Sequence, residues 1–462
     1  MIHKFSLLDR NIVVDVESGA VLTLDPTAFA LLDYASAEMP ENPPKEALSA
    51  VDASESEIRE SWNELREMVS EGLLFAPAQE LDPDITKVMG FAPVKALCLH
   101  VAHDCNLRCK YCFASTGDFG TGRKLMSPEV AKKAIDFVVK RSGKRTNIEI
   151  DFFGGEPLLA MDTVKETIEY CKNFPEKNFR FTITTNGVAL DDETIDYINE
   201  HMSNVVLSLD GRKPINDEMR PAPNGKGSFD VIVPKFQKLV KDRKPTGKDY
   251  YVRGTFTKKN LDFADDVIEM YNLGFDQLSI EPVVADKLEN IPSEENRKIV
   301  EEYALTEADL PTIYREYERL VEEMLKNRDF NFFHFNIDLE QGPCVIKRLR
   351  GCGAGFEYVA ITPEGDIYPC HQFVGKPEYL MGNVFTDGFD TKIAEQFGRL
   401  NVYTRPDCAD CWAKYYCSGG CNAANLAANG ALDKAYKMGC DLERKRVECA
   451  IALKVREMEE DA

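Results

Sequence analysis

A chain of 462 residues, 44% of them hydrophobic, has the length and composition of an ordinary globular protein with two or three domains. Its 78 acidic residues outnumber 56 lysines and arginines and give a net charge of −22, which repels phosphate backbones and argues against a nucleic-acid partner. No apolar run reaches 18 residues and no signal segment opens the sequence, so we expect a cytoplasmic protein without a membrane partner.

Residues 1–85 read as a small separate module. We expect strands at 5–8, 12–16 and 21–24, helices at 26–36, 44–51 and 56–71, and a closing strand at 73–75. Strands and helices in this arrangement predict a winged-helix-like unit. A linker is expected at residues 76–86, which contain two prolines.

Residues 92–310 alternate strands with amphipathic helices. The expected strands are, in order, 95–101, 147–153, 179–184, 204–209, 250–257 and 276–283. Between the first two, Ser127 and Pro128 start a helix, with proline at the first helical position. Six such units predict an α/β fold with a parallel sheet, either a partial (β/α)6 barrel of the TIM type or a doubly wound sheet.

The rest of the chain divides into a bridging region at 311–343, with one amphipathic helix, and a loop-rich region at 344–462. Fourteen cysteines in a chain expected to be cytoplasmic indicate metal ligands rather than disulfides. Cys98, Cys171 and Cys449 stand alone and fit small buried hydrophobes. The other eleven fall into clusters, and metal clusters hold loop-rich sequence together more readily than a large apolar core does.

The segment after the first barrel strand carries Cys105, Cys109 and Cys112 in a Cys-x3-Cys-x2-Cys run. Three thiolates in one loop can hold three irons of a [4Fe–4S] cluster, which takes four ligands, and leave one iron open to an exogenous ligand. A structural zinc site that borrows a distant ligand is the alternative. With Tyr111 before the third cysteine, the spacing resembles the signature of the radical S-adenosylmethionine (SAM) enzymes, whose fold is a (β/α)6 partial barrel.

A Gly-Gly-Glu-Pro turn follows the second barrel strand, at the edge of the sheet where barrel enzymes place their chemistry. Its glycines permit close approach of the backbone, and its glutamate offers a carboxylate to an ammonium group. The turn matches the motif that receives the amino group of SAM in radical SAM enzymes. A serine and an arginine twelve residues apart resemble the pair that contacts the ribose and carboxylate of SAM, although this arginine could instead form a surface ion pair. By this resemblance the SAM-binding residues are Tyr111, Gly154, Gly155, Glu156, Pro157, Asn186, Ser208, Arg220 and Val283.

Seven further cysteines resemble the SPASM domain, which holds auxiliary [4Fe–4S] clusters in peptide-modifying radical SAM enzymes; a zinc ribbon on four of them is the alternative. The resemblance implies that the distal cluster is held by Cys408, Cys411, Cys417 and Cys440. It implies that the proximal cluster is held by Cys352, Cys370 and Cys421, with Cys344 as a candidate fourth ligand. If Cys344 does not bind, the open iron could take a substrate thiolate directly.

The N-terminal module resembles the RiPP recognition element, which binds the leader of a ribosomal precursor peptide as an added strand at a sheet edge. Strand 12–16 or strand 21–24 would offer that edge; a stabilising domain without a ligand is the alternative. The three-part layout and residues 5–11 (FSLLDRN) resemble the SCIFF-type maturases, which act on a six-cysteine peptide.

This resemblance implies a radical SAM oxidoreductase that installs cysteine thioether crosslinks, of the sactipeptide or ranthipeptide type, in a cysteine-rich precursor peptide. The implied cofactors are SAM and three [4Fe–4S] clusters, and the implied redox partner is a reductant such as ferredoxin or flavodoxin. One alternative is a sulfatase-type formylglycine maturase, although that family lacks a module like residues 1–85. Two others are another peptide crosslinking or oxidising enzyme and an iron–sulfur electron carrier. His371 and Glu281 are candidates for the general base by position alone.

Overall fold

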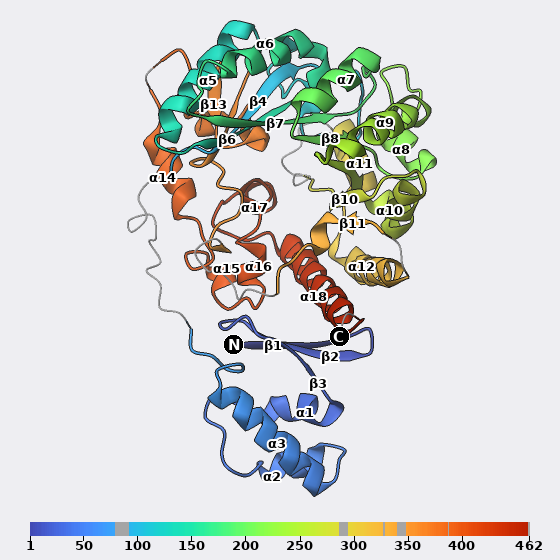
Figure 1. The fold of residues 1–462 in the computed structure, drawn as a ribbon, viewed down its shortest axis with the longest axis vertical. Coiled ribbons are helices and arrows are strands. Elements are labelled where there is room, and N and C mark those ends of the chain that lie inside the picture. The colour runs from blue at the N-terminus through green and yellow to red at the C-terminus, as the bar shows by residue number, and fades with distance from the viewer. Residues whose placement is uncertain (79–91, 286–293, 327–328, 340–347, 387, 461–462) are drawn as a thin grey trace.

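The computed structural model of the chain describes residues 1–78, 92–285, 294–326, 329–339, 348–386 and 388–460. Three parts follow one another along the long axis: the N-terminal module, the cysteine-rich region with the C-terminal helix, and the curved sheet with its helices (Figure 1). Within the described residues, no helix combines the length and apolar character needed to cross a bilayer.

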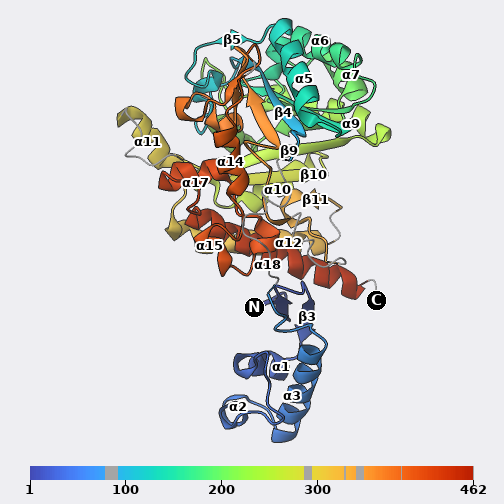
Figure 2. The same cartoon turned by 90° about the vertical axis from the view of Figure 1, so that its left-hand side faces the viewer.

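The N-terminal module is a three-stranded antiparallel sheet in the order β1-β2-β3, followed by three helices. Its elements are β1 (Ile2–Leu7), β2 (Arg10–Asp15), β3 (Val21–Leu24), α1 (Pro26–Leu31), α2 (Lys45–Ala50) and α3 (Glu55–Ser70). Alternation along β2 sends Val13 into the module's own core, whereas Ile12 and Val14 pack against Val447 and Ile451 of the C-terminal helix. The sheet therefore lies between its own helices and the C-terminal helix (Figure 2).

Two expectations for this module are wrong. Leu73–Phe75 forms no strand, because Phe75 adopts the left-handed region with φ of 54°, while Leu74 simply fills the module's core. Strand 12–16 cannot offer an edge, because β2 is the middle strand and pairs on both sides. The expected linker lies outside the described residues from residue 79 onward.

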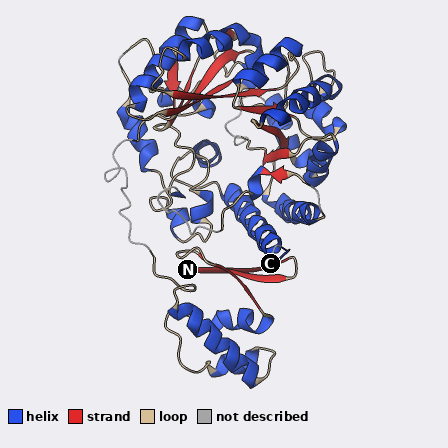
Figure 3. Ribbon diagram, viewed as in Figure 1, coloured by secondary structure: helices blue, strands red, loops and turns tan. Residues whose placement is uncertain are grey.

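The six barrel strands are confirmed as parallel neighbours in chain order, β4-β6-β7-β8-β9-β10. Their bounds are β4 (Ala96–His103), β6 (Asn147–Gly154), β7 (Asn178–Thr185), β8 (Asn204–Ser208), β9 (Asp249–Phe256) and β10 (Gln277–Pro282). A doubly wound sheet reverses its strand order at a switch point, and this run has no reversal. The arrangement is therefore a partial barrel, open between β10 and β4 (Figure 3).

Helices cover the outer face of this sheet. Ser127 caps the first of them by accepting the Val130 N–H, and Pro128 takes the first helical position as expected. The helices that pack buried apolar residues against the sheet are α5 (Pro128–Ser142), α6 (Met161–Cys171), α7 (Asp192–His201), α9 (Phe229–Arg243), α10 (Phe263–Asn272) and α12 (Leu310–Leu325). Two further helices, α8 (Lys213–Met219) and α11 (Glu294–Tyr303), contribute Met219 and Tyr303 to a separate apolar cluster with Val283.

The cysteine-rich region extends the sheet, which the sequence did not predict. β12 pairs in parallel with β4, and β13 and β14 continue the sheet as antiparallel strands, while β11 lies at the far edge and β5 pairs with β4. The remaining elements are β5 (Lys124–Leu125), β11 (Asn331–Phe332), β12 (Tyr358–Ile361), β13 (Asp366–Tyr368), β14 (Gly382–Asn383), α14 (Thr391–Arg399), α15 (Pro406–Ala409), α16 (Lys414–Cys417), α17 (Asn422–Asn429) and α18 (Lys437–Glu460). This pairing fixes the cysteine-rich loops against the open side of the barrel.

Candidate active site

A cavity of about 730 Å³ joins the carboxyl ends of the barrel strands to the cysteine-rich loops. Its wall includes the loop after β4, the turn after β6, and side chains from β7 to β10. On the other side it includes Cys408, Cys411, Cys417, Cys421 and Cys440. Such a concave site with convergent polar groups is the expected form of a binding or catalytic site.

The first three cysteines lie together in the loop after β4. Neighbouring backbone holds this loop, since Arg108 N–H donates to the Pro221 carbonyl at 2.7 Å and Lys110 N–H to the Met219 carbonyl at 3.0 Å. Burial raises the pKa of Cys105 to about 11 and that of Cys109 to about 12. These thiols therefore need a metal to be deprotonated near neutral pH, and three thiols in one loop fit a cluster with an open iron.

The two glycines after β6 are required by close packing of backbone on backbone. A Cβ on Gly154 would collide with the carbonyl oxygen of Ala102, and one on Gly155 with the carbonyl oxygen of Asp104. Backbone hydrogen bonds also join this turn to the end of β4 and the residue after it. The Gly155 N–H donates to the Ala102 carbonyl, and the Glu156 N–H donates to the Asp104 carbonyl. The turn thus sits directly on the cysteine loop, which explains the glycines by packing as well as by access to a ligand.

Glu156 is buried and already accepts three hydrogen bonds. Its donors are the Leu158 N–H at 3.1 Å, the Thr185 hydroxyl at 2.7 Å and the Asn186 N–H at 2.8 Å. Burial raises the pKa of this carboxyl to about 7 in spite of these bonds. Asn186 in turn reaches the cysteine loop, where its amide donates to Asn106 Oδ1 at 2.8 Å.

Arg220 points into the cavity but forms a buried ion pair, with Nε 3.0 Å from Asp210 Oδ2. The expected alternative, a surface ion pair, is wrong because Arg220 is 8% exposed and Asp210 fully buried. The Tyr111 hydroxyl donates to the same carboxylate at 2.6 Å, and Arg220 lies 5.5 Å from the Tyr111 ring. Ser208 and Val283 also line this part of the cavity.

The C-terminal cysteines form two groups, as judged by the effect of each thiol on the pKa of its neighbours. Burial is the largest cause of the raised pKa of five of these thiols, and a neighbouring thiol of the same group raises each of the five further; the five are Cys352, Cys370, Cys408, Cys417 and Cys440. One group is Cys352, Cys370 and Cys421. The other is Cys408, Cys411, Cys417 and Cys440.

Thiolates around a single tetrahedral zinc lie about 3.8 Å apart. In the described part of the chain, no three His, Cys, Asp or Glu side chains gather closely enough to hold one metal ion. Cys344 lies outside the described residues.

Both expected base candidates line the cavity. Burial lowers the pKa of His371 to about 4, so its ring is neutral and a weak base at neutral pH. Burial alone would raise the pKa of Glu281, but His334, Arg253 and Arg446 outweigh it and lower that pKa below its ordinary value. Glu281 lies 3.1 Å from Arg253 and 3.5 Å from Arg446, so its charge is already paired.

Sequence reasoning missed Asp151, which lines the cavity from β6. Along this strand Ile148, Ile150 and Phe152 are fully buried on the helix side, which leaves Asp151 and Phe153 on the inner face. The alternation of apolar and polar residues along this strand could have predicted that the Asp151 carboxylate lies on the inner face of the sheet.

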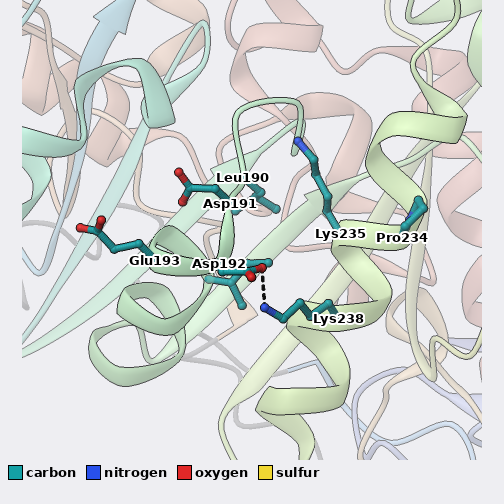
Figure 4. A pocket seen from close by; sticks show the side chains of 8 residues that line it. Leu190, Asp191, Asp192, Glu193, Pro234, Lys235 and Lys238 are labelled. Atoms are coloured by element: carbon teal, nitrogen blue, oxygen red, sulfur yellow. Dashed lines mark hydrogen bonds and ion pairs between the residues drawn. The ribbon is translucent and has the colours of Figure 1, made fainter.

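A second hollow lies outside the barrel, between the start of α7 and α9 (Figure 4). Its charged groups serve the fold: Asp191 caps α7, the Lys238 ammonium donates to Asp192, and the Lys235 ammonium donates to the Val188 carbonyl. None of the expected site residues lines it.

Two family matches agree with the predicted layout. Residues 99–260 match the Radical SAM superfamily, and residues 352–412 match the iron–sulfur cluster-binding domain named SPASM. The chain therefore carries a radical SAM domain followed by a SPASM domain, which confirms that part of the prediction. Together the two domains imply SAM and multiple [4Fe–4S] clusters as cofactors.

Related sequences cover different shares of the chain. An uncharacterised protein of Methanocaldococcus jannaschii is 32% identical over 188 residues, which span 40% of this chain and 61% of that protein. A cysteine-type anaerobic sulfatase-maturating enzyme of Clostridium novyi is 26% identical over 354 residues, 72% of this chain and 89% of the enzyme.

Solved structures resemble the fold at low identity. The structure of anSMEcpe with bound AdoMet has a TM-score of 0.64 at 19% identity and covers 80% of this chain and 96% of its own. SuiB of Streptococcus suis bound to precursor peptide SuiA has a TM-score of 0.52 at 18% identity and covers 95% of this chain and 98% of its own. The second likeness therefore extends over more of this chain.

Proposed function

We propose that this chain is a cytoplasmic radical SAM maturase, of the SCIFF type, that installs cysteine thioether crosslinks in a cysteine-rich ribosomal precursor peptide. The observation that carries the proposal is the cavity, because it runs without a break from the loop of Cys105–Cys112 to Cys408–Cys440. A peptide held there would contact both the SAM-binding edge and the auxiliary clusters.

In this proposal the loop cysteines hold the SAM-binding cluster, and the Gly154–Pro157 turn and Arg220 orient SAM. When bound, SAM and its cluster supply a 5′-deoxyadenosyl radical that removes a hydrogen atom from the substrate. Asp210 holds Arg220 and Tyr111 in place through the contacts given above. The remaining contacts come from Asn186, Ser208 and Val283, which line the same part of the cavity.

The two cysteine groups support the assignment of two auxiliary clusters, making three [4Fe–4S] clusters in all, which a ferredoxin or flavodoxin would reduce. Cys352, Cys370 and Cys421 would hold the proximal cluster, with Cys344 as its fourth ligand or with one iron left for a substrate thiolate. Cys408, Cys411, Cys417 and Cys440 would hold the distal cluster.

We further propose that the N-terminal module is a RiPP recognition element that receives the leader peptide along β3. β3 pairs only with β2 among the described strands, so its other side is open. The Asp15 N–H bonds the Ala20 carbonyl, and alternation from that pair turns the N–H groups of Val21 and Thr23 toward the open side. The wide coverage by SuiB, which was solved with a precursor peptide, supports this role.

A second candidate, formylglycine formation on a sulfatase, is favoured by the relative from Clostridium novyi. Among solved structures, which are compared in one way, anSMEcpe covers 80% of this chain and SuiB covers 95% of it. The larger share favours a peptide maturase with a recognition module.

The test is an anaerobic reaction of the reconstituted enzyme with SAM, dithionite and a cysteine-rich precursor peptide. Thioether formation predicts the loss of two hydrogen atoms and of one alkylatable thiol per crosslink, with matching 5′-deoxyadenosine. Formylglycine instead replaces the sulfur by oxygen and reacts with a hydrazide probe. Deoxyadenosine with no change in peptide mass would contradict the proposal, and a Cys112→Ala protein, expected to give neither product, is the control.

A further inference from the structure

Thioether formation requires a base. One C–H and one S–H bond break and one C–S bond forms, so a hydrogen atom, an electron and a proton leave the peptide. The SAM cofactor takes the hydrogen atom, and an iron–sulfur cluster takes the electron. The proton of the thiol needs an acceptor among the side chains of the cavity.

Asp151 lies on the inner wall of the barrel, in the lining of the cavity. It stands on β6, three residues before Gly154, and pairs in register with Cys98 of β4 and Thr182 of β7. The cavity reaches both Asp151 and Thr182, together with Arg253 of β9. A substrate side chain that enters the barrel below the SAM-binding edge would meet this carboxyl.

The Asp151 carboxyl has no hydrogen bond to hold it in place. Its Oδ1 is fully enclosed and has no partner among the described residues. Burial is the main reason that the pKa of this carboxyl is raised to about 7. The positive charge of Arg253 lowers this pKa, and the negative charge of Glu149 raises it. Cys98 and Tyr358 also face it, and Asp151 raises the pKa of both. A buried carboxyl without partners is costly, and such groups cluster where a protein uses them.

The other candidate bases of the cavity are committed elsewhere. The Glu156 carboxylate accepts hydrogen bonds from three donors, and Glu281 forms ion pairs with Arg253 and Arg446. His371 follows Cys370 directly, within the expected ligand set of the proximal cluster. Asp151 differs from all three because its side chain lines the cavity while its Oδ1 has no hydrogen-bond partner among the described residues.

We propose that Asp151 is the general base that removes the proton from the substrate cysteine thiol. The S–H bond breaks as the O–H bond to the Asp151 carboxylate forms, and the proton then passes to water. This assignment rests on the proposed function. It fills the role of general base, for which His371 and Glu281 are poorly suited. Because the base must be ionised, product formation rises with pH as Asp151 titrates.

The test compares Asp151→Asn and Asp151→Glu with the wild type, each as reconstituted holoenzyme with the same precursor peptide. We expect Asp151→Asn to yield roughly 100-fold less crosslink per deoxyadenosine, within the usual range for loss of a general base. The acid limb of the wild-type pH profile, expected near pH 7, should disappear in Asp151→Asn and return at a shifted pH in Asp151→Glu. Asp196→Asn, an exposed position on α7, is the matched control and should behave as wild type.

A readout apart from turnover is the infrared C=O absorption of protonated carboxyls that titrate near pH 7, to which both Asp151 and Glu156 should contribute in wild-type holoenzyme. Asp151→Asn should lose the Asp151 part of this absorption and keep the part from Glu156. Equal crosslink per deoxyadenosine and an unchanged pH profile in Asp151→Asn, with full iron content, would overturn the assignment alone. Wild-type enzyme that makes deoxyadenosine but never alters the peptide would overturn the proposed function, and the base assignment with it.

Discussion

A buried ion pair holds the N-terminal sheet on the cysteine-rich region, and its loss should release the sheet. The Lys414 ammonium lies 2.9 Å from Glu17 Oε1, with the two side chains only 6% and 4% exposed. The Tyr415 hydroxyl donates to Glu17 Oε2 at 3.1 Å. Lys414 lies between Cys411 and Cys417, so this contact joins the sheet to a proposed cluster loop.

The perturbation is Glu17→Gln, which leaves the Lys414 ammonium buried without a countercharge. Removing one partner of a buried pair costs about 3–5 kcal/mol. Undocking the sheet relieves that cost, because it returns the ammonium to water. At about 1.4 kcal/mol for each factor of ten, the undocked population should rise by a factor of roughly 10² to 4 × 10³.

The assay is native-state alkylation of a cysteine introduced at Val14, read by mass spectrometry of that peptide. Val14 is 0% exposed and faces α18, so its substitute reacts only when the sheet undocks. A cysteine at Val13 is the matched control, because that position faces the module's own core. Glu55→Gln, which breaks an exposed ion pair with Arg59, should change the rate at position 14 by less than about fivefold.

Equal alkylation at position 14 with and without Glu17→Gln would refute the reasoning. An equal rise at positions 13 and 14 would refute it too, because the module would then be unfolding rather than undocking. Adding Lys414→Met to Glu17→Gln removes both charges and should restore most of the protection.

Three further predictions follow from the site. Gly155→Ala should lower iron content and SAM binding, because its Cβ collides with the Asp104 carbonyl that carries the cysteine loop. Gly388→Ala is the control for an added methyl group, because the nearest atom to its Cβ, Thr386 Oγ1, is 3.8 Å away. Arg220→Lys should weaken SAM binding roughly tenfold in equilibrium titration while iron content stays intact, and unchanged affinity would exclude Arg220 from the SAM contacts. Thr23→Pro removes an N–H from the open side of β3 and should weaken leader binding, measured by fluorescence anisotropy, at least tenfold.

Much of the barrel could be predicted because its determinants are local. Each parallel strand is a short apolar run, and each is followed by a helix with its own start, as Ser127 and Pro128 show for α5. The cysteine loop was readable for the same reason, since its spacing lies within eight residues of sequence. Strand order followed once the units were known, because successive units pack side by side.

Other features depend on contacts between distant segments and could not be read from local pattern. The pairing of β12 with β4 joins residues about 260 positions apart, and no periodicity in either strand indicates it. The middle position of β2 follows from its pairing with both β1 and β3, and its two apolar faces serve different cores. Leu73–Phe75 had the composition of a strand, but the left-handed backbone at Phe75 ended that possibility.

Four of the carboxylates that line the cavity or lie directly behind its wall show that partners decide their chemistry more than burial does. Asp210 holds Arg220 and Tyr111, and Glu281 is neutralised by two arginines. Burial raises the pKa of both Glu156 and Asp151 to about 7, yet Glu156 accepts three hydrogen bonds, whereas Asp151 Oδ1 has no partner in the part of the chain that the structure describes. Proton transfer needs a free oxygen as well as a suitable pKa, and in this cavity only Asp151 among these four offers both.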